Sequence, residues 1–333
     1  DARWGRVMEG GGEDPYLGSQ IAAARINGFQ GSDLGATNTI AACAKHFAAY
    51  GFAEAGRDYN TADIGTSTLH NIILPPFKAA VAAGVRTFMN SFNELNGIPA
   101  TGDSYLQRDL LKGQWGFTGF VVSDWGSIDQ MVPHGYAQDG AHAAEIAVHA
   151  GSDMDMESYH YIGHLANLVR AGKVDIQLVD DAVKRILTVK YELGLFDDPY
   201  QYCDEQREQE LTYSQDNLAR ALEISKKSIV LLKNENDVLP LEKKGQRIAL
   251  IGPLADDKNS PLGSWRAAAD DNSAISVLEG MQQYKDNNIT YSKGVTLTLE
   301  ETSFIREVKV NETDRTGMKE AEKIAKGSDV VVM

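Results

Sequence analysis

The chain has 333 residues and a formal net charge of −15, because 47 Asp and Glu outnumber 32 Lys and Arg. This balance argues against nucleic acid and anionic membrane as partners, since both reward clustered positive charge, and it leaves neutral substrates open. The two cysteines, Cys43 and Cys203, have no spacing typical of a metal site or a disulfide framework. No run approaches the ~20 apolar residues of a membrane span, and the length predicts about two domains of roughly 150 residues each.

The first region, up to Phe196, alternates predicted strands with predicted helices. Apolar strands at 39–44, 84–89 and 117–122 each end on polar residues, and helices are predicted at 67–83, with Pro75-Pro76 as a break, 106–111 and 141–150. Alternation of this kind favours parallel strands joined by helical crossovers. Cys43 lies in the first apolar run, so we expect a buried thiol, and the apolar stripes of the helical stretch 161–195 are expected in the core.

The second region follows a polar connector, 196–213, that is rich in Asp, Glu and Gln and is predicted to be a linker. It contains a predicted helix at 214–228 and predicted strands at 247–253 and 328–333. Such strands need neighbours on both sides and helices on both faces. We therefore expect the second domain, 214–333, to be incomplete. The first domain, 1–195, is also short for an eight-fold barrel of ~250 residues.

The most informative stretch is Phe117–Gly126, an apolar strand that stops on Ser-Asp-Trp-Gly. Residues just past the C-terminal end of a strand line the active site of an α/β barrel, whereas residues within the strand pack its interior. Asp124 is therefore a candidate catalytic residue, with Val121 and Val122 as core. The alternative is an Asp that caps the following helix through backbone N–H groups.

Other strand ends and the N-terminal segment supply polar residues that favour a sugar site over a metal or phosphate site. Arg6, Lys45 and His46 would hydrogen-bond hydroxyl groups, and Trp125 would pack on the C–H face of a sugar. The run Gly10–Gly12 lacks the signature of a phosphate or dinucleotide loop, and no Gly-x-Ser-x-Gly elbow occurs. The alternative for Lys45-His46 is a buried structural ion pair.

For two further aspartates and five histidines, the sequence does not indicate a catalytic or metal-binding role. Asp153 and Asp155 alternate with methionines at a strand end, and we expect one of them to support the site. Five histidines show no ligand spacing with nearby carboxylates: His134, His142, His149, His160 and His164. No metal and no cofactor are expected.

Seven motifs in order resemble glycoside hydrolase family 3, on its β-glucosidase branch. They are DARWGR at 1–6, GEDPYL at 12–17, AKHF at 44–47, GRDYN at 56–60, FNELNG at 92–97, VSDWG at 122–126 and KSIVLLKN at 227–234. The resemblance covers nearly the whole chain. It implies a (β/α)8 barrel followed by an α/β sandwich domain, and hydrolysis of glycosides with retention of configuration.

The resemblance also implies roles for single residues. Asp124 matches the nucleophile, and the remaining matches are substrate-binding residues: Arg6, Lys45, His46, Met89, Phe92, Trp125, Ser264 and Trp265. Phe92 stands where many members carry a Tyr, so the hydrogen bond of that hydroxyl is missing. Lys45 and Arg6 would help to keep Asp124 ionised. The general acid/base would be a Glu beyond Met333, and a sugar-binding Asp would precede Asp1, so we expect an internal fragment of a longer enzyme.

The resemblance favours an exo-acting β-glucosidase in the periplasm or secreted, with a small glycoside or oligosaccharide as partner and a homodimer as an open option. A β-xylosidase of the same family is an alternative. The N-acetylhexosaminidase branch is disfavoured, because Lys45–Gly51 lacks its Pro-Gly-His/Asp-Gly run. Two alternatives from other classes are a non-catalytic carbohydrate-binding homologue and a Schiff-base lyase that uses Lys45.

Overall fold

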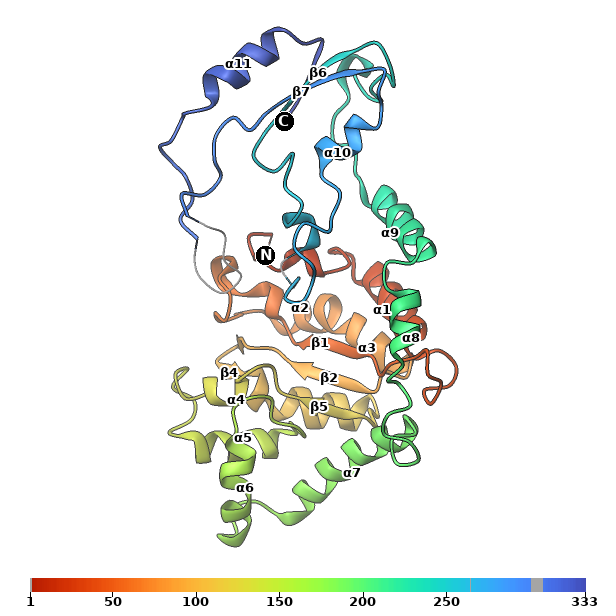
Figure 1. Cartoon of the computed structure of the whole chain (residues 1–333). Coiled ribbons are helices and arrows are strands. Elements are labelled where there is room, and N and C mark those ends of the chain that lie inside the picture. Colours follow the sequence, from red (N-terminus) through yellow and green to blue (C-terminus); the bar gives the residue numbers. More distant parts are fainter. Residues whose placement is uncertain (1, 264, 301–307) are drawn as a thin grey trace. The chain divides into compact units, whose positions relative to one another are not determined.

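The computed structural model describes residues 2–263, 265–300 and 308–333 and divides into two compact units, Asp1–Asn217 and Leu218–Met333 (Figure 1). Each unit combines helices with a parallel sheet, so the chain has the α/β class that the sequence predicts. The division lies four residues beyond the end of the predicted linker, 196–213.

The sheet of the first unit consists of β1 (Cys43–Phe47), β2 (Thr87–Asn90) and β5 (Phe120–Val122), in the order β1-β2-β5. All neighbours are parallel, with Cys43 beside Thr87 and Met89 beside Val122. An isolated parallel bridge between Val122 and Met154 continues the sheet beyond β5. Figure 1 shows the three strands side by side, in orange to yellow.

Helices connect these strands, and several begin at an aspartate that caps the first turn. Asp14, Asp139 and Asp175 accept backbone N–H groups at the starts of α1, α5 and α7. The helical elements of this unit are η1 (Val7–Glu9), α1 (Pro15–Gln30), η2 (Tyr50–Phe52), η3 (Glu54–Gly56), α2 (Thr66–Thr68), η4 (Leu69–Ile73), α3 (Leu74–Ala82), η5 (Ala100–Gly102), η6 (Tyr105–Gln114), α4 (Ser127–Gln130), α5 (Gly140–Ala150), α6 (His160–Arg170), α7 (Ile176–Glu192) and α8 (Glu205–Leu211). A short antiparallel hairpin, β3 (Glu94–Leu95) with β4 (Ile98–Pro99), follows β2.

The core of the first unit includes buried side chains from all three strands of the sheet. Phe47, Phe88 and Val121 are fully buried, one from each strand, and the rings of Phe47 and Phe88 meet edge to face with centroids 5.3 Å apart. Gly119 precedes β5 at a point where a Cβ atom would collide with the carbonyl oxygen of Arg86. Only glycine therefore lets β5 approach the segment that leads into β2.

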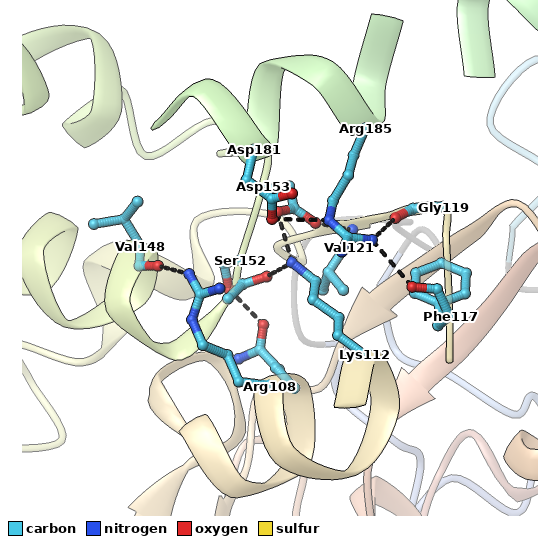
Figure 2. A network of polar contacts seen from close by, with 12 residues as sticks. Arg108, Lys112, Phe117, Gly119, Val121, Val148, Ser152, Asp153, Asp181 and Arg185 are labelled. Carbon is cyan, nitrogen blue, oxygen red and sulfur yellow. Dashed lines mark hydrogen bonds and ion pairs between the residues drawn. The ribbon is translucent and has the colours of Figure 1, made fainter. Parts of the chain in front are cut away.

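A buried polar network fixes β5 from outside the sheet (Figure 2). Lys112 of η6 pairs with Asp153 at 2.7 Å, and the other Asp153 oxygen accepts the N–H of Val121 at 2.8 Å. Arg185 of α7 donates to the carbonyl oxygens of Phe117 and Gly119, both at 3.0 Å. Two helices thus hold the strand that leads to Asp124.

Three predictions about this unit are wrong in detail. The strand predicted at 39–44 lies later, as β1, so Lys45 and His46 are within the strand. Cys43 is exposed instead of buried. The helical stretch 161–195 is two helices, and Val183 and Leu187 of α7 are 47% and 43% exposed. Apolar character predicts burial only where another element covers the residue.

The second unit has a smaller parallel sheet of β6 (Arg247–Ile251), β7 (Asn288–Ser292) and β8 (Val330–Val332), in the order β7-β6-β8. Its helices are α9 (Gln215–Ser228), which begins in the first unit, α10 (Val277–Gln282) and α11 (Met318–Lys326), with the turns η7 (Glu235–Asp237) and η8 (Ser260–Leu262). Leu250, Ala255 and Leu278 form its buried cluster. In the described parts of both units, no helix has the length and apolar character that crossing a membrane requires.

Candidate active site

Asp124 lies two residues beyond the end of β5, with only 8% of its surface exposed. Its Oδ1 accepts the N–H of Trp125 at 2.7 Å, whereas its buried Oδ2 has no hydrogen-bond partner among the described residues. The capping alternative is not observed, because the N-cap of α4 is Gly126 and no side chain caps that helix. One oxygen is therefore anchored and the other is left for a ligand.

Hydrogen bonds on both sides hold the turn that carries Asp124. Ser123 donates its N–H to the Met154 carbonyl at 2.9 Å, and Gly126 donates to the Met156 carbonyl at 2.8 Å. The Met156 N–H in turn donates to Ser123 Oγ at 2.8 Å. These bonds fix the backbone before and after Asp124. The segment next to β5 therefore determines the direction in which the Asp124 side chain points.

His46 of β1 brings an imidazole to the free oxygen of Asp124, with Nε2 3.5 Å from Oδ2. Arg6 Nη2 lies 3.2 Å from the same Nε2. A guanidinium can only donate, so Nε2 must accept and the proton of His46 must be on Nδ1. Burial, followed by the charges of Lys45 and Arg6, lowers the pKa of His46 to about 3. The imidazole is therefore neutral at neutral pH and forms no ion pair with Asp124.

The Arg6 side chain contacts one carboxylate and two aromatic rings. Its Nε and Nη2 donate to the two carboxylate oxygens of Glu9 at 2.7 and 2.9 Å. Its guanidinium carbon lies 5.9 Å from the ring centre of Trp4 and 5.5 Å from that of Tyr50. Trp4 Nε1 donates to Asp58 at 2.9 Å, which ties this N-terminal segment to the loop after β1.

The pKa of Asp124 is raised, mainly because the carboxyl is buried. The Trp125 N–H, Lys45 and Arg6 lower this pKa, as predicted for the two cations, and Asp58 raises it. Burial, which the sequence analysis did not weigh, outweighs the cations, so the net shift in the pKa of Asp124 is upward. Lys45 is exposed, which also excludes the buried structural pair considered for Lys45-His46.

The other predicted site residues differ in their surroundings. Met89 of β2 is half-buried and lies beside Val122 in the sheet. Phe92 is buried, with its ring centre 4.7 Å from Tyr59 and 5.7 Å from Tyr50. Trp125 is 64% exposed, and Trp265 of the second unit is 65% exposed. Ser264 lies outside the described residues.

Sequence reasoning missed several residues around the site. Glu9 has the signal Arg6-x-x-Glu9, an (i, i+3) spacing that allows a fork-to-carboxylate contact. Tyr59 lies in the motif at 56–60, and burial, Asp58 and Asp124 together raise its pKa. The Tyr59 phenol lies near Asp124 and its ring contacts Phe92, which stands where many members of the family carry a Tyr hydroxyl. Such proximity depends on loop geometry and has no signature in the sequence.

Asp153 and Asp155, one of which was expected to support the site, both hold the chain next to the Asp124 turn. Asp153 joins Lys112 to β5, as described above. Asp155 accepts the N–H groups of Ser158 and Tyr161 at 3.2 and 3.1 Å. Both carboxylates therefore stabilise the segment whose backbone bonds hold the Asp124 turn.

This arrangement can attack an electrophilic carbon of a neutral, hydroxyl-bearing ligand. Asp124 offers a buried oxygen without a partner, Arg6 and Lys45 offer positive charge, and the Trp125 indole offers an exposed face. Cations and aromatic faces of this kind hold hydroxyl groups and C–H surfaces.

Comparison with known proteins agrees with a site for a neutral, hydroxyl-bearing ligand. The sequence model of the glycosyl hydrolase family 3 N terminal domain matches residues 1–189, and that of the family 3 C-terminal domain matches residues 229–333. A periplasmic beta-glucosidase of Salmonella typhimurium is 40% identical, and the match covers all of this chain and 45% of that protein. A beta-xylosidase of Formosa agariphila is 34% identical over 100% of the chain and 46% of its own length.

Solved structures agree. A beta-glucosidase from Listeria innocua in complex with glucose superposes with a TM-score of 0.88 at 36% identity, covering 100% of this chain and 44% of that one. The chain thus spans less than half the length of these relatives. The two domain matches and the 40% identity over the whole chain show that this chain belongs to glycosyl hydrolase family 3.

Proposed function

We propose that the protein is a retaining, exo-acting β-glycosidase that releases glucose from the nonreducing end of β-glucosides. The observation that carries the proposal is the buried Asp124 carboxylate, anchored through Oδ1 and without a partner at Oδ2. Glucosidase activity is favoured over other glycosidase activities by relatives named as beta-glucosidases, one of which is solved with glucose.

In the proposed reaction, Asp124 Oδ2 attacks the anomeric carbon as the bond to the leaving oxygen breaks, and a second carboxylic acid protonates that oxygen. Water, deprotonated by the same second group, then attacks the glycosyl-enzyme and releases the sugar with retained configuration. By family resemblance, the second group is a glutamic acid. The raised pKa of Asp124 makes its carboxylate more basic and so a stronger nucleophile once ionised.

We assign the sugar-binding roles by the family match and by the surroundings of each side chain. Arg6 and Lys45 supply donors to hydroxyl groups, His46 supplies a neutral imidazole, and Trp125 supplies the aromatic face. Met89, Phe92, Ser264 and Trp265 keep their proposed contacts with the substrate. No metal and no cofactor enter the reaction.

We extend the proposal to the fold and the location. β1, β2, β5 and the Val122–Met154 bridge would be neighbouring strands of a (β/α)8 barrel, and β6 to β8 would belong to an α/β sandwich domain. The domain bounds would be 1–195 and 214–333, joined by the linker 196–213. We also propose a periplasmic or secreted protein, which the periplasmic relative supports, with neither nucleic acid nor membrane as a partner and with a homodimer as an open state.

The experiment is hydrolysis of p-nitrophenyl β-glucoside by the protein and by its Asp124→Asn variant. We expect hydrolysis by the parent, a loss of about 10⁴-fold or more in the variant, and β-glucose as the first sugar product by NMR. A 2-fluoro glucoside should label Asp124, as found by mass spectrometry of peptides. An active Asp124→Asn variant, or a label on another residue, would exclude the proposed nucleophile.

A β-xylosidase is the second candidate, because relatives at 34% identity carry that name. The ratio of kcat/KM for p-nitrophenyl β-glucoside and β-xyloside decides between the two. A parent protein that hydrolyses neither but binds glucose would favour the carbohydrate-binding alternative. Borohydride trapping of a carbonyl substrate on Lys45 would favour the lyase alternative.

A further inference from the structure

Glu9 lies behind Arg6 and binds it by a fork. Its two oxygens accept from Arg6 Nε and Nη2 in parallel, at 2.7 and 2.9 Å. The side chains of Arg6 and Glu9 are 15% and 25% exposed, so the pair is shielded from much of the solvent. Such bidentate pairs fix the plane of the guanidinium as well as its position.

The fork leaves Arg6 close to the free oxygen of Asp124 without joining it. Arg6 Nη2 and Asp124 Oδ2 approach the same atom, His46 Nε2, at 3.2 and 3.5 Å. Within the described residues, no ion pair joins Arg6 to Asp124, although Oδ2 is an unfilled acceptor. An arginine next to an unpaired carboxylate would normally form the pair, so something must restrain it.

The restraint is the combination of Glu9 with the rings of Trp4 and Tyr50. The rings support the guanidinium from the side, at 5.9 and 5.5 Å from their centres. Rotation of Arg6 towards Asp124 would require both bonds to Glu9 to break. Glu9 is a carboxylate partner of Arg6 and the part of this restraint that can be removed with little change of shape.

We propose that Glu9 is a positioning residue that holds Arg6 away from Asp124, so that the nucleophilic oxygen stays unpaired and the guanidinium stays available to a sugar hydroxyl. This inference rests on the proposed function. Without the Glu9 charge, Arg6 turns to Asp124 Oδ2 and forms an ion pair there. The paired carboxylate is a poorer nucleophile, because its attack on the anomeric carbon must first break that pair.

Other charges also act on Asp124 and stay in place when Glu9 changes. The titratable groups around it come from β1 and from the loop that follows: Cys43, Lys45, His46, Asp58 and Tyr59. Glu9 itself acts on one of them, because its charge raises the pKa of His46, so the Arg6→Ala background is needed to isolate the part of a changed pH profile that comes from movement of Arg6.

The experiment is a double-mutant cycle with Glu9→Gln, Arg6→Ala and both together, on p-nitrophenyl β-glucoside. Glu9→Gln keeps the shape of the side chain and should lower kcat/KM by up to about 10²-fold. It should also move the acidic limb of the kcat/KM profile to lower pH, because a close cation favours the charged form of Asp124. In the Arg6→Ala background, Glu9→Gln should change neither value.

The controls separate this inference from folding and from the proposed function. Glu205→Gln, at an exposed position of α8, should behave as the parent, and thermal unfolding should show that Glu9→Gln is folded. An unmoved acidic limb, or an equal loss in the Arg6→Ala background, would overturn the positioning role. An inactive parent or an active Asp124→Asn variant would instead overturn the proposed function.

Discussion

Asp124 and Asp153 are buried aspartates on two neighbouring segments of one sheet, and they differ in how their oxygens are used. Both side chains are nearly inaccessible, and burial raises the pKa of both. Asp153 has partners for both oxygens, Lys112 and the Val121 N–H. Asp124 has one, the Trp125 N–H. A carboxylate with two partners holds the chain together, whereas one with a single partner keeps an oxygen for chemistry at a cost in stability.

The largest expected difference is in catalysis. Asp124→Asn should lower kcat by about 10⁴-fold or more, while Asp153→Asn should retain much of its kcat at a temperature where it is still folded. Steady-state kinetics on p-nitrophenyl β-glucoside at 15 °C, with the folded fraction measured by circular dichroism, tests this. Equal losses in the two variants would remove the distinction.

The second difference is in stability, in the opposite order. Asp153→Asn should lower the free energy of unfolding by about 3–5 kcal/mol, because Lys112 is left buried without its partner. The double variant Lys112→Met/Asp153→Leu should recover part of this loss, since it removes both charges. Urea unfolding measures both, with Asp63→Asn, at an exposed position, as the control. A double variant less stable than Asp153→Asn would contradict the account.

A third prediction concerns His46, which the site keeps neutral. Its pKa is lowered to about 3, below the unfolded value, so the unfolded state binds the proton first. His46 should therefore cost about 2 kcal/mol of stability as the pH falls from 7 to 5, and His46→Gln should lose less over that range. Nitrogen NMR should also show a neutral ring with Nδ1 protonated from pH 5 to 8. A His46 resonance that titrates near pH 6.5 would contradict this.

The smallest effect is the stability gained when Asp124 is neutralised. Asp124→Asn should stabilise the protein at neutral pH by up to about 1 kcal/mol, because it removes a buried charge with an unfilled oxygen. The raised pKa means that the parent gains stability as the pH falls through that pKa, and the variant has no such gain. The difference in melting temperature between Asp124→Asn and the parent should therefore become smaller as the pH is lowered. A parent more stable than the variant at pH 7 would refute this.

The sequence predicted the α/β class, the strand that leads to Asp124 and the polar residues that gather near it. These follow from local patterns, since an apolar run that stops on Ser-Asp-Trp-Gly can be recognised without knowledge of its neighbours. The position of β1 could not be predicted in this way. The bounds of β1 depend on its pairing with β2: Cys43 and Ala44 pair before an irregularity in the register and Phe47 pairs after it, so the strand spans Lys45 and His46.

Contacts between distant residues account for what the sequence left out. Lys112 and Asp153 are 41 positions apart, and Trp4 and Asp58 are 54 apart, so no spacing rule connects them. The net upward shift in the pKa of Asp124 was missed for the same reason. Nearby cations can be found in the sequence, whereas the depth of burial depends on the packed structure.

The turn at Ser123–Gly126 has a consequence for the order in which this protein is made. Its backbone is held by Met154 and Met156, about thirty residues further along the chain. During synthesis, Asp124 therefore leaves the ribosome well before the segment that shapes its surroundings. Until Met156 has emerged and paired, the growing chain carries the carboxylate in an unformed loop, and the reactive geometry arises only when the later segment arrives.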